Sequence, residues 1–259
     1  MKEKRSIKKT ISIIIGLLIM VVIIGAIYFL SSGYDPMEEA LAALESTDTV
    51  TVMEGEFGYE FIPIGGAEKA LIYYPGGLVD HRAYAPFLHQ LAEEGIAGFL
   101  VQMPFDLAIL GSGRAGGVME KYEAEIDHWV IGGHSLGGAM AARFVDRNPE
   151  AEVEGLILFA SYPGGGNDLS GRDDLSVLSI YGTRDGLVSE ENFADSPDLL
   201  PPETVWLEIP GGNHSQFGYY GFQDGDLEAE ISREEQHQLM IEGVNAFFEE
   251  IGEERIFED

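Results

Sequence analysis

The feature that most constrains the fold is an alternation of two kinds of segment through the middle of the chain. Short apolar runs bounded by glycine or proline predict buried strands, and apolar residues at helical spacing between several of them predict helices. Such an alternation is typical of an α/β fold with a mostly parallel, twisted sheet flanked by helices. The predicted strands are Ala70–Tyr74, Ile96–Gln102, Trp129–Ile131, Gly155–Ala160, Leu175–Tyr181 and Val205–Ile209, and the predicted helices are Tyr84–Glu94, Ala139–Asp146 and Arg233–Ile251.

The segments before this alternation predict a different beginning to the sheet. Val50–Glu54 and Tyr59–Ile64 indicate two antiparallel strands, and Pro36–Leu44 indicates a helix with Asp35 as its N-cap. The chain has 259 residues, of which 45% are hydrophobic, enough to bury the core of one ordinary domain. We therefore expect a single catalytic domain over residues 36–259.

The first thirty residues predict a membrane anchor. Residues 1–10 carry five lysines and arginines against one acid, and the next twenty, Ile11–Leu30, carry no charge. Twenty apolar residues span a bilayer core, and basic residues stay on the cytoplasmic side. We expect a cytoplasmic segment (1–10), a single-pass transmembrane signal-anchor (11–30), a linker (31–35) and an extracytoplasmic domain at the cell membrane. A cleavable secretory signal is the alternative, but it usually ends in small residues rather than Ile27–Leu30.

The charge of the chain excludes one class of partner. The formal net charge is −30, and without the first thirty residues it falls to about −34, from 10 basic and 44 acidic side chains. Nucleic-acid binding needs clustered lysine and arginine against phosphate, so we expect no nucleic-acid partner. The chain has no cysteine, which excludes disulfide bonds and thiolate zinc sites.

The segment Gly133-His134-Ser135-Leu136-Gly137 matches the pattern G-x-S-x-G. In a chain with 33 glycines these five letters alone are weak evidence. Their context is stronger, because a predicted strand leads in and a predicted helix leads out, with small residues that permit a strained turn. This arrangement predicts a nucleophile elbow with Ser135 as nucleophile.

A serine nucleophile needs a base and an acid that orients the base, in the chain order Ser, Asp, His. Asp185 follows the predicted strand Leu175–Tyr181, and His214 follows the next one. These positions predict Asp185 as the acid, with Asp173 or Asp174 next in line, and His214 as the base. We expect the His134 side chain to point away from the serine, and the remaining histidines to lie in surface-like polar settings: His81, His89, His128 and His237.

Acyl transfer also needs two backbone N–H groups that stabilise an oxyanion. One is expected from Leu136, directly after the serine. The other is expected from the segment after Ala70–Tyr74, where Gly76 and Gly77 let the backbone approach a substrate. We predict the N–H of Gly77, with that of Leu78 as the alternative.

With these features in one order, the chain resembles the α/β-hydrolase superfamily from about Val50 to Ile251, and in particular its small dienelactone-hydrolase-like members. The resemblance implies an α/β-hydrolase fold and a serine hydrolase that cleaves a carboxylic ester of a small-molecule acyl substrate without a cofactor. Dienelactone hydrolases proper use a cysteine nucleophile, so their substrate class does not transfer. A peptidase, thioesterase or acyltransferase with the same residues stays open, as does a non-catalytic binding domain on this scaffold. The motifs are Tyr74–Asp80, Gly132–Gly138, Tyr181–Gly186 and Gly211–His214.

Two further segments bear on the site. Ser161–Asp174 is too short and polar for a helical lid, so we expect little or no lid and a preference for short, uncharged acyl groups. Asp224-Gly225-Asp226 lacks the spacing of a calcium loop, which indicates a solvated acidic turn and no metal site. Nothing in the sequence fixes the oligomeric state.

Overall fold

The computed structural model describes residues 14–21, 23–25, 27, 29, 32–188, 193–194 and 196–254. The chain divides into two compact units, Met1–Gly33 and Tyr34–Asp259. The predicted cytoplasmic segment 1–10 lies outside the described residues, as do parts of the predicted membrane segment Ile11–Leu30. Among the described residues, no helix is both long and apolar enough to cross a membrane.

The second unit contains, in its described part, one sheet of eight strands in the order β1-β2-β4-β3-β5-β6-β7-β8. Strand β2 pairs antiparallel with β1 and with β4, and the pairs from β4 through β8 are parallel. This confirms the expected mostly parallel sheet with an antiparallel start. The strands are β1 Val50–Glu54, β2 Gly58–Pro63, β3 Lys69–Tyr74, β4 Ala97–Val101, β5 His128–His134, β6 Val153–Phe159, β7 Ser176–Gly182 and β8 Val205–Ile209.

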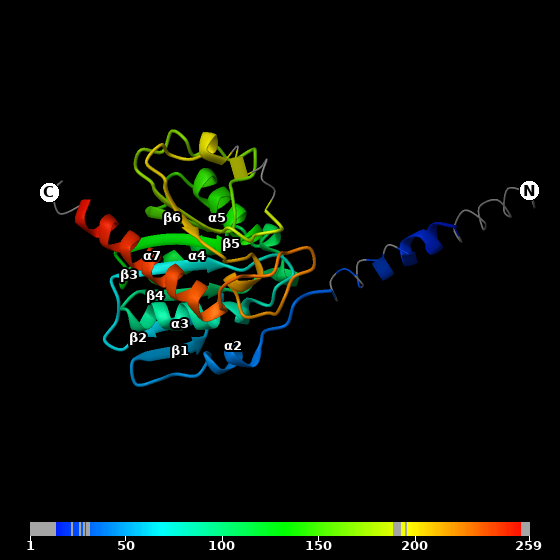
Figure 1. The fold of residues 1–259 in the computed structure, drawn as a ribbon, viewed down its shortest axis with the longest axis horizontal. Helices are drawn as coiled ribbons and strands as arrows, with labels where there is room; N and C mark the ends of the chain where they lie inside the picture. The colour runs from blue at the N-terminus through cyan, green and yellow to red at the C-terminus, as the bar shows by residue number, and fades with distance from the viewer. Residues whose placement is uncertain are drawn as a thin grey trace, which may run out of the picture. The chain divides into compact units, whose positions relative to one another are not determined.

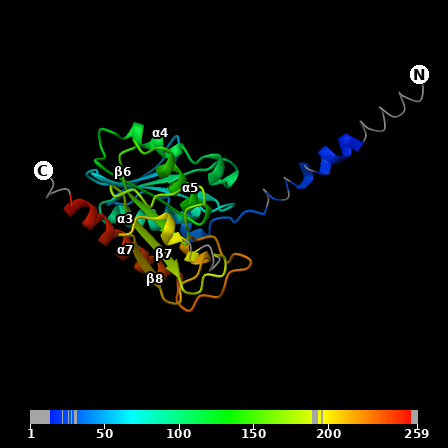
Figure 2. The same cartoon turned by 90° about the horizontal axis from the view of Figure 1, so that it is seen from above.

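Both faces of the central strands β3 to β6 are buried, which explains why these strands are continuous apolar runs. On β3, Leu71 and Tyr73 belong to one hydrophobic cluster, whereas Ile72 and Tyr74 belong to the other. The first cluster lies under two helices on one face and the second under two on the opposite face (Figures 1 and 2). These helices are α3 (Ala85–Glu93) and α7 (Arg233–Glu254) on the first face, and α4 (Arg114–Lys121) and α5 (Leu136–Arg147) on the second.

Two helices differ from the prediction. Helix α2 spans only Glu38–Ala42, and its N-cap is Met37 with no side-chain hydrogen bond, so the expected cap at Asp35 was wrong. The backbone before it is already engaged, because the Met37 N–H donates to the Tyr219 carbonyl (2.8 Å). Helix α4 was not predicted, since its two adjacent glycines are poor helix formers. It forms because Ala115 and Val118 are buried against the sheet.

The carboxyl ends of the parallel strands meet at one edge of the sheet. The segments that follow β3, β5, β6, β7 and β8 therefore all begin at this edge. Between β6 and β7, residues 160–175 contain no helix. The edge thus collects the loops that carry every residue predicted for the site.

Candidate active site

Ser135 lies in a strained turn between β5 and α5, at φ 52° and ψ −120°. Such a conformation is costly for a residue with a side chain, and it presents the side chain at the tip of the turn. The turn closes only because its glycines carry no Cβ. A Cβ on Gly137 would lie 2.2 Å from the Tyr74 carbonyl oxygen, and one on Gly133 would lie 2.6 Å from the same atom. We call Gly133–Gly137 the serine elbow.

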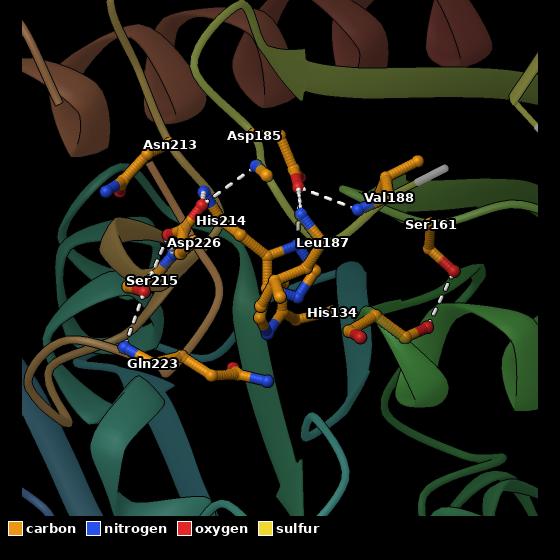
Figure 3. Close-up of polar contacts among 12 residues, drawn as sticks. His134, Ser161, Asp185, Leu187, Val188, Asn213, His214, Ser215, Gln223 and Asp226 are labelled. Carbon is orange, nitrogen blue, oxygen red and sulfur yellow. Dashed lines mark hydrogen bonds and ion pairs between the residues drawn. The ribbon is translucent and has the colours of Figure 1, made fainter. Parts of the chain in front are cut away.

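The end of the neighbouring strand β6 holds the backbone of Ser135. The Ser135 N–H donates to the Phe159 carbonyl (3.0 Å), and the Ser161 hydroxyl donates to the Ser135 carbonyl (2.6 Å; Figure 3). Ser161 was not predicted from the sequence. A signal was present, because Ser161 follows a buried strand at the same kind of position as the other predicted site residues.

His214 and Asp185 lie together, as the sequence analysis predicted. The His214 Nδ1 donates to Asp185 Oδ2 at 2.8 Å, and the two side chains are 2% and 7% exposed. The other carboxylate oxygen of Asp185 accepts the N–H groups of Leu187 (2.8 Å) and Val188 (2.9 Å; Figure 3). Because a carboxylate only accepts, the proton of the neutral imidazole lies on Nδ1 and leaves Nε2 as the basic nitrogen.

His134 joins this pair to the serine elbow. Its ring centroid is 4.4 Å from that of His214, and it stacks on Phe217 at 5.5 Å. Ser135 follows His134 in the chain, so the backbone of the serine elbow lies next to the residue whose ring contacts His214. The Ser135 hydroxyl has no hydrogen-bond partner among the described residues. In structures without a substrate, the hydrogen bond between a catalytic nucleophile and its base is often long or poorly aligned.

A second buried carboxylate supports the same loops. Asp226 is only 8% exposed, so the expected solvated turn at Asp224–Asp226 was wrong at this residue. Its Oδ1 accepts the N–H groups of Gly186 (3.0 Å) and His214 (3.4 Å), and its Oδ2 accepts both the N–H and the hydroxyl of Ser215 (2.7 Å each; Figure 3). Asp226 therefore ties the loop of the acid to the loop of the histidine. Within the described part of the chain, no group of three potential metal ligands occurs.

The surface-like setting expected for the other histidines was wrong for most of them. His81, His89 and His237 are at most 9% exposed, and burial lowers the pKa of His81 to about 4 and that of His237 to about 3. Only His128 keeps a partly exposed side chain, and it pairs with Glu154 at 2.9 Å. Polar neighbours in the sequence do not report burial, because rings at those positions can still turn toward the core.

The loop after β3, residues 75–80, contains both candidates for the second oxyanion donor. A Cβ on Gly77 would lie 3.0 Å from the Leu136 side chain, so the two predicted donor residues are neighbours. The Leu78 N–H is already engaged, because it donates to the Asp106 carbonyl (2.8 Å). The Gly77 N–H has no acceptor among the described residues. The N–H of Leu136 begins α5 and belongs to the group without an intrahelical acceptor.

An eight-stranded, mostly parallel sheet with a serine elbow after β5 and the loops of Asp185 and His214 after β7 and β8 is the arrangement of an α/β hydrolase. The sequence model of the alpha/beta hydrolase family matches residues 70–238. The chain belongs to this family.

Solved structures support the same fold. The chain is similar to a dienelactone hydrolase-like promiscuous phosphotriesterase, P91, from metagenomic libraries, with 21% identity over 78% of this chain and 96% of that one and a TM-score of 0.51. An esterase from Pyrobaculum calidifontis has 16% identity over 81% and 90% of the two chains and a TM-score of 0.55. Est1E from Butyrivibrio proteoclasticus has 16% identity over 79% and 99%, with a TM-score of 0.52. No curated protein was found to match the chain.

Proposed function

We propose that the chain is a serine hydrolase that cleaves a carboxylic ester or a related acyl bond of a small molecule, without a cofactor. Two observations carry the proposal. Ser135 lies in a strained elbow directly after His134, whose ring contacts His214, and the His214 Nδ1 donates to a buried carboxylate at 2.8 Å. Ser135 is the nucleophile, His214 the general base and Asp185 the acid that fixes the imidazole tautomer.

In this mechanism His214 Nε2 takes the Ser135 proton as the serine oxygen attacks the carbonyl carbon. The resulting imidazolium is stabilised by Asp185 and then gives its proton to the leaving group, which departs from an acyl-enzyme. Water, activated by the same nitrogen, releases the acyl group and restores the serine. The N–H groups of Gly77 and Leu136 receive the oxyanion. The engaged N–H of Leu78 supports the choice of Gly77.

The test uses a fluorophosphonate probe and steady-state kinetics on a panel of ester, thioester, amide and phosphotriester substrates. Ser135→Ala should abolish both labelling and hydrolysis while leaving thermal unfolding unchanged. Asp185→Asn should lower kcat on the order of 10⁴-fold, because the amide favours the wrong tautomer. The control is Asp174→Asn, which removes the alternative acid from an ion pair with Arg172 and should leave kcat unchanged.

Three outcomes would contradict the proposal. Hydrolysis by Ser135→Ala near the wild-type rate would place the nucleophile elsewhere. A loss below about tenfold in Asp185→Asn, far short of the triad expectation, would place the acid elsewhere. A wild-type chain that neither reacts with the probe nor hydrolyses any substrate in the panel would favour a binding domain on a hydrolase scaffold.

The same panel addresses acyl length. Residues 160–175 contain no helix that could cover an acyl chain, which supports an open site. Burying one methylene group stabilises a bound acyl chain by about 0.8 kcal/mol, and an open site does not provide this stabilisation for long chains. We therefore expect kcat/KM on p-nitrophenyl esters to peak at short acyl groups of roughly two to six carbons. A steady rise through long-chain esters would contradict an open site.

We also propose that residues 11–30 anchor the chain in the cell membrane, with the catalytic domain outside the cytoplasm. The uncharged run after a basic segment supports this, and the described residues of the run are helical with exposed apolar side chains such as Leu18 (60%) and Val21 (66%). The full chain should sediment with membranes, and residues 34–259 should stay soluble and active. The deletion must spare Tyr34, whose N–H donates to the Leu78 carbonyl (2.7 Å). A full chain that stays in the soluble fraction would contradict the anchor.

A further inference from the structure

A chain of buried hydrogen bonds runs behind the proposed site from the β3 loop to the histidine. The Gly76 N–H donates to Tyr84 Oη at 3.0 Å, and Tyr84 Oη lies 2.9 Å from His134 Nδ1. Tyr84 and His134 are both fully buried, and the His134 ring lies against that of His214. The hydrogen bonds therefore begin one residue before Gly77 and end at His134, whose ring contacts the proposed base.

Tyr84 Oη accepts the Gly76 N–H and makes a second hydrogen bond with His134 Nδ1, whose direction depends on the tautomer of the His134 ring. Among the described residues, His134 Nε2 has no hydrogen-bond partner. Burial, reinforced by the charge of His214, lowers the pKa of His134, which keeps its ring neutral. A neutral ring does not oppose the positive charge that forms on His214 during acyl transfer.

The close approach of the three groups requires a residue without a side chain. A Cβ on Gly76 would lie 2.8 Å from Tyr84 Oη and 2.9 Å from His134 Nδ1. Phe217 stacks on the His134 ring, with the two ring centroids 5.5 Å apart, and so limits how far His134 can move. The spacing between the β3 loop and the ring of His214 is thus set by packing as well as by hydrogen bonds.

We infer that Tyr84 and His134 are positioning residues that hold the Gly77 N–H and the His214 ring at a fixed spacing around Ser135. This inference rests on the proposed function, because it assigns the residues to the geometry of acyl transfer. Neither side chain touches the reacting atoms. Their effect is on the oxyanion donor and the base, whose interactions are strongest in the transition state.

Tyr84→Phe tests the inference, and the chain supplies a matched control. Tyr73 is also fully buried, with its ring 5.1 Å from that of Tyr84, but its hydroxyl has no partner among the described residues. Each phenylalanine variant loses one buried hydroxyl, and only Tyr84→Phe breaks hydrogen bonds. We expect kcat to fall about 10- to 100-fold in Tyr84→Phe with KM nearly unchanged, because a misplaced oxyanion donor weakens transition-state binding alone. Tyr73→Phe should keep the wild-type kcat.

His134→Phe supplies a second readout and keeps the ring stacked on Phe217. Rates are normalised to the folded fraction from thermal unfolding, so that simple destabilisation does not lower kcat. If Tyr84 and His134 act through one chain of hydrogen bonds, the double variant that combines His134→Phe with Tyr84→Phe should have the same kcat as the less active of the two single variants. If one of the two single variants does not fold, the other still tests the inference, because its kcat is expected to fall by the same factor relative to Tyr73→Phe.

Two results would overturn the inference: a kcat for Tyr84→Phe within twofold of that for Tyr73→Phe, or losses that multiply in the double variant. Ser135→Ala separates this failure from failure of the proposed function. If Ser135→Ala is inactive and Tyr84→Phe matches its control, only the positioning role is wrong. If Ser135→Ala retains activity, the proposed function itself is wrong.

Discussion

The serine elbow and the loops of Asp185 and His214 lie at the same edge of the sheet, but the chain holds them in place by different means. The elbow is fixed by the close packing of backbone on backbone. A Cβ on Gly137 would meet the carbonyl oxygens of Tyr74 at 2.2 Å and Pro75 at 2.5 Å, and no charged side chain takes part. The elbow can form because Gly133 and Gly137 have no Cβ atom.

The loops of the acid and the histidine are fixed by buried carboxylates instead. Asp185 accepts two backbone N–H groups besides the His214 ring, and Asp226 accepts N–H groups from both loops. These loops are irregular, so their buried N–H groups have no strand or helix partner and need acceptors from side chains. A short turn between two regular elements can be shaped by sterics alone, whereas longer loops need specific hydrogen bonds.

The largest effect that separates the two regions is expected from Gly137→Ala. The added methyl group meets backbone atoms that cannot rotate away, so the end of β3 and the elbow must shift. We expect the free energy of unfolding to fall by about 3 kcal/mol, or the chain not to fold, and kcat to fall at least about 100-fold where it does. Thermal unfolding and ester hydrolysis measure both. Gly166→Ala is the control, because nothing lies within 4 Å of its Cβ position. Equal stability of the two variants would refute steric control of the elbow.

A smaller effect is expected from Asp226→Asn. The amide keeps the size of the side chain, but its NH₂ group faces a donor wherever it replaces an accepting oxygen. We expect the free energy of unfolding to fall by about 1–3 kcal/mol, the cost of an unsatisfied buried group, and kcat to fall about tenfold. The matched control is Asp224→Asn, two residues away and exposed, which should change neither quantity. Identical behaviour of the two variants would show that these loops do not depend on the carboxylate.

Most of the sheet could be predicted from the sequence, because the central parallel strands are buried on both faces and read as continuous apolar runs. β4, predicted at Ile96–Gln102, spans Ala97–Val101. The helices were harder. α5 begins at Leu136 rather than Ala139. α4 was missed because its glycines lie against aromatic rings, Gly117 against Phe57 and Gly116 against Phe144, which helix propensity does not report.

The candidate site was predicted to a similar extent. Ser135, Asp185 and His214 follow strands, and strand ends are visible in the sequence. Gly77 was predicted ahead of Leu78, and the structure adds a reason that the sequence does not contain, because the carbonyl of the distant residue Asp106 accepts the Leu78 N–H. Three supporting residues were missed because their contacts depend on the tertiary structure: Tyr84, His134 and Asp226. Ser161 could have been found from its position after a buried strand.

By itself, the sequence determined the class of fold, the position of the elbow and the order of the three proposed catalytic residues. These features are local: they depend on the apolar period of a segment or on glycines within a few residues of a serine. Only the tertiary structure decided which amide stays free, which aspartate is buried and which histidine lies beside the base. Tyr84 and His134 are fifty residues apart, and only the pairing of β3 with β5 brings the β3 loop and its neighbours against the serine elbow. Contacts of this kind follow from strand order, which no single segment of the chain records.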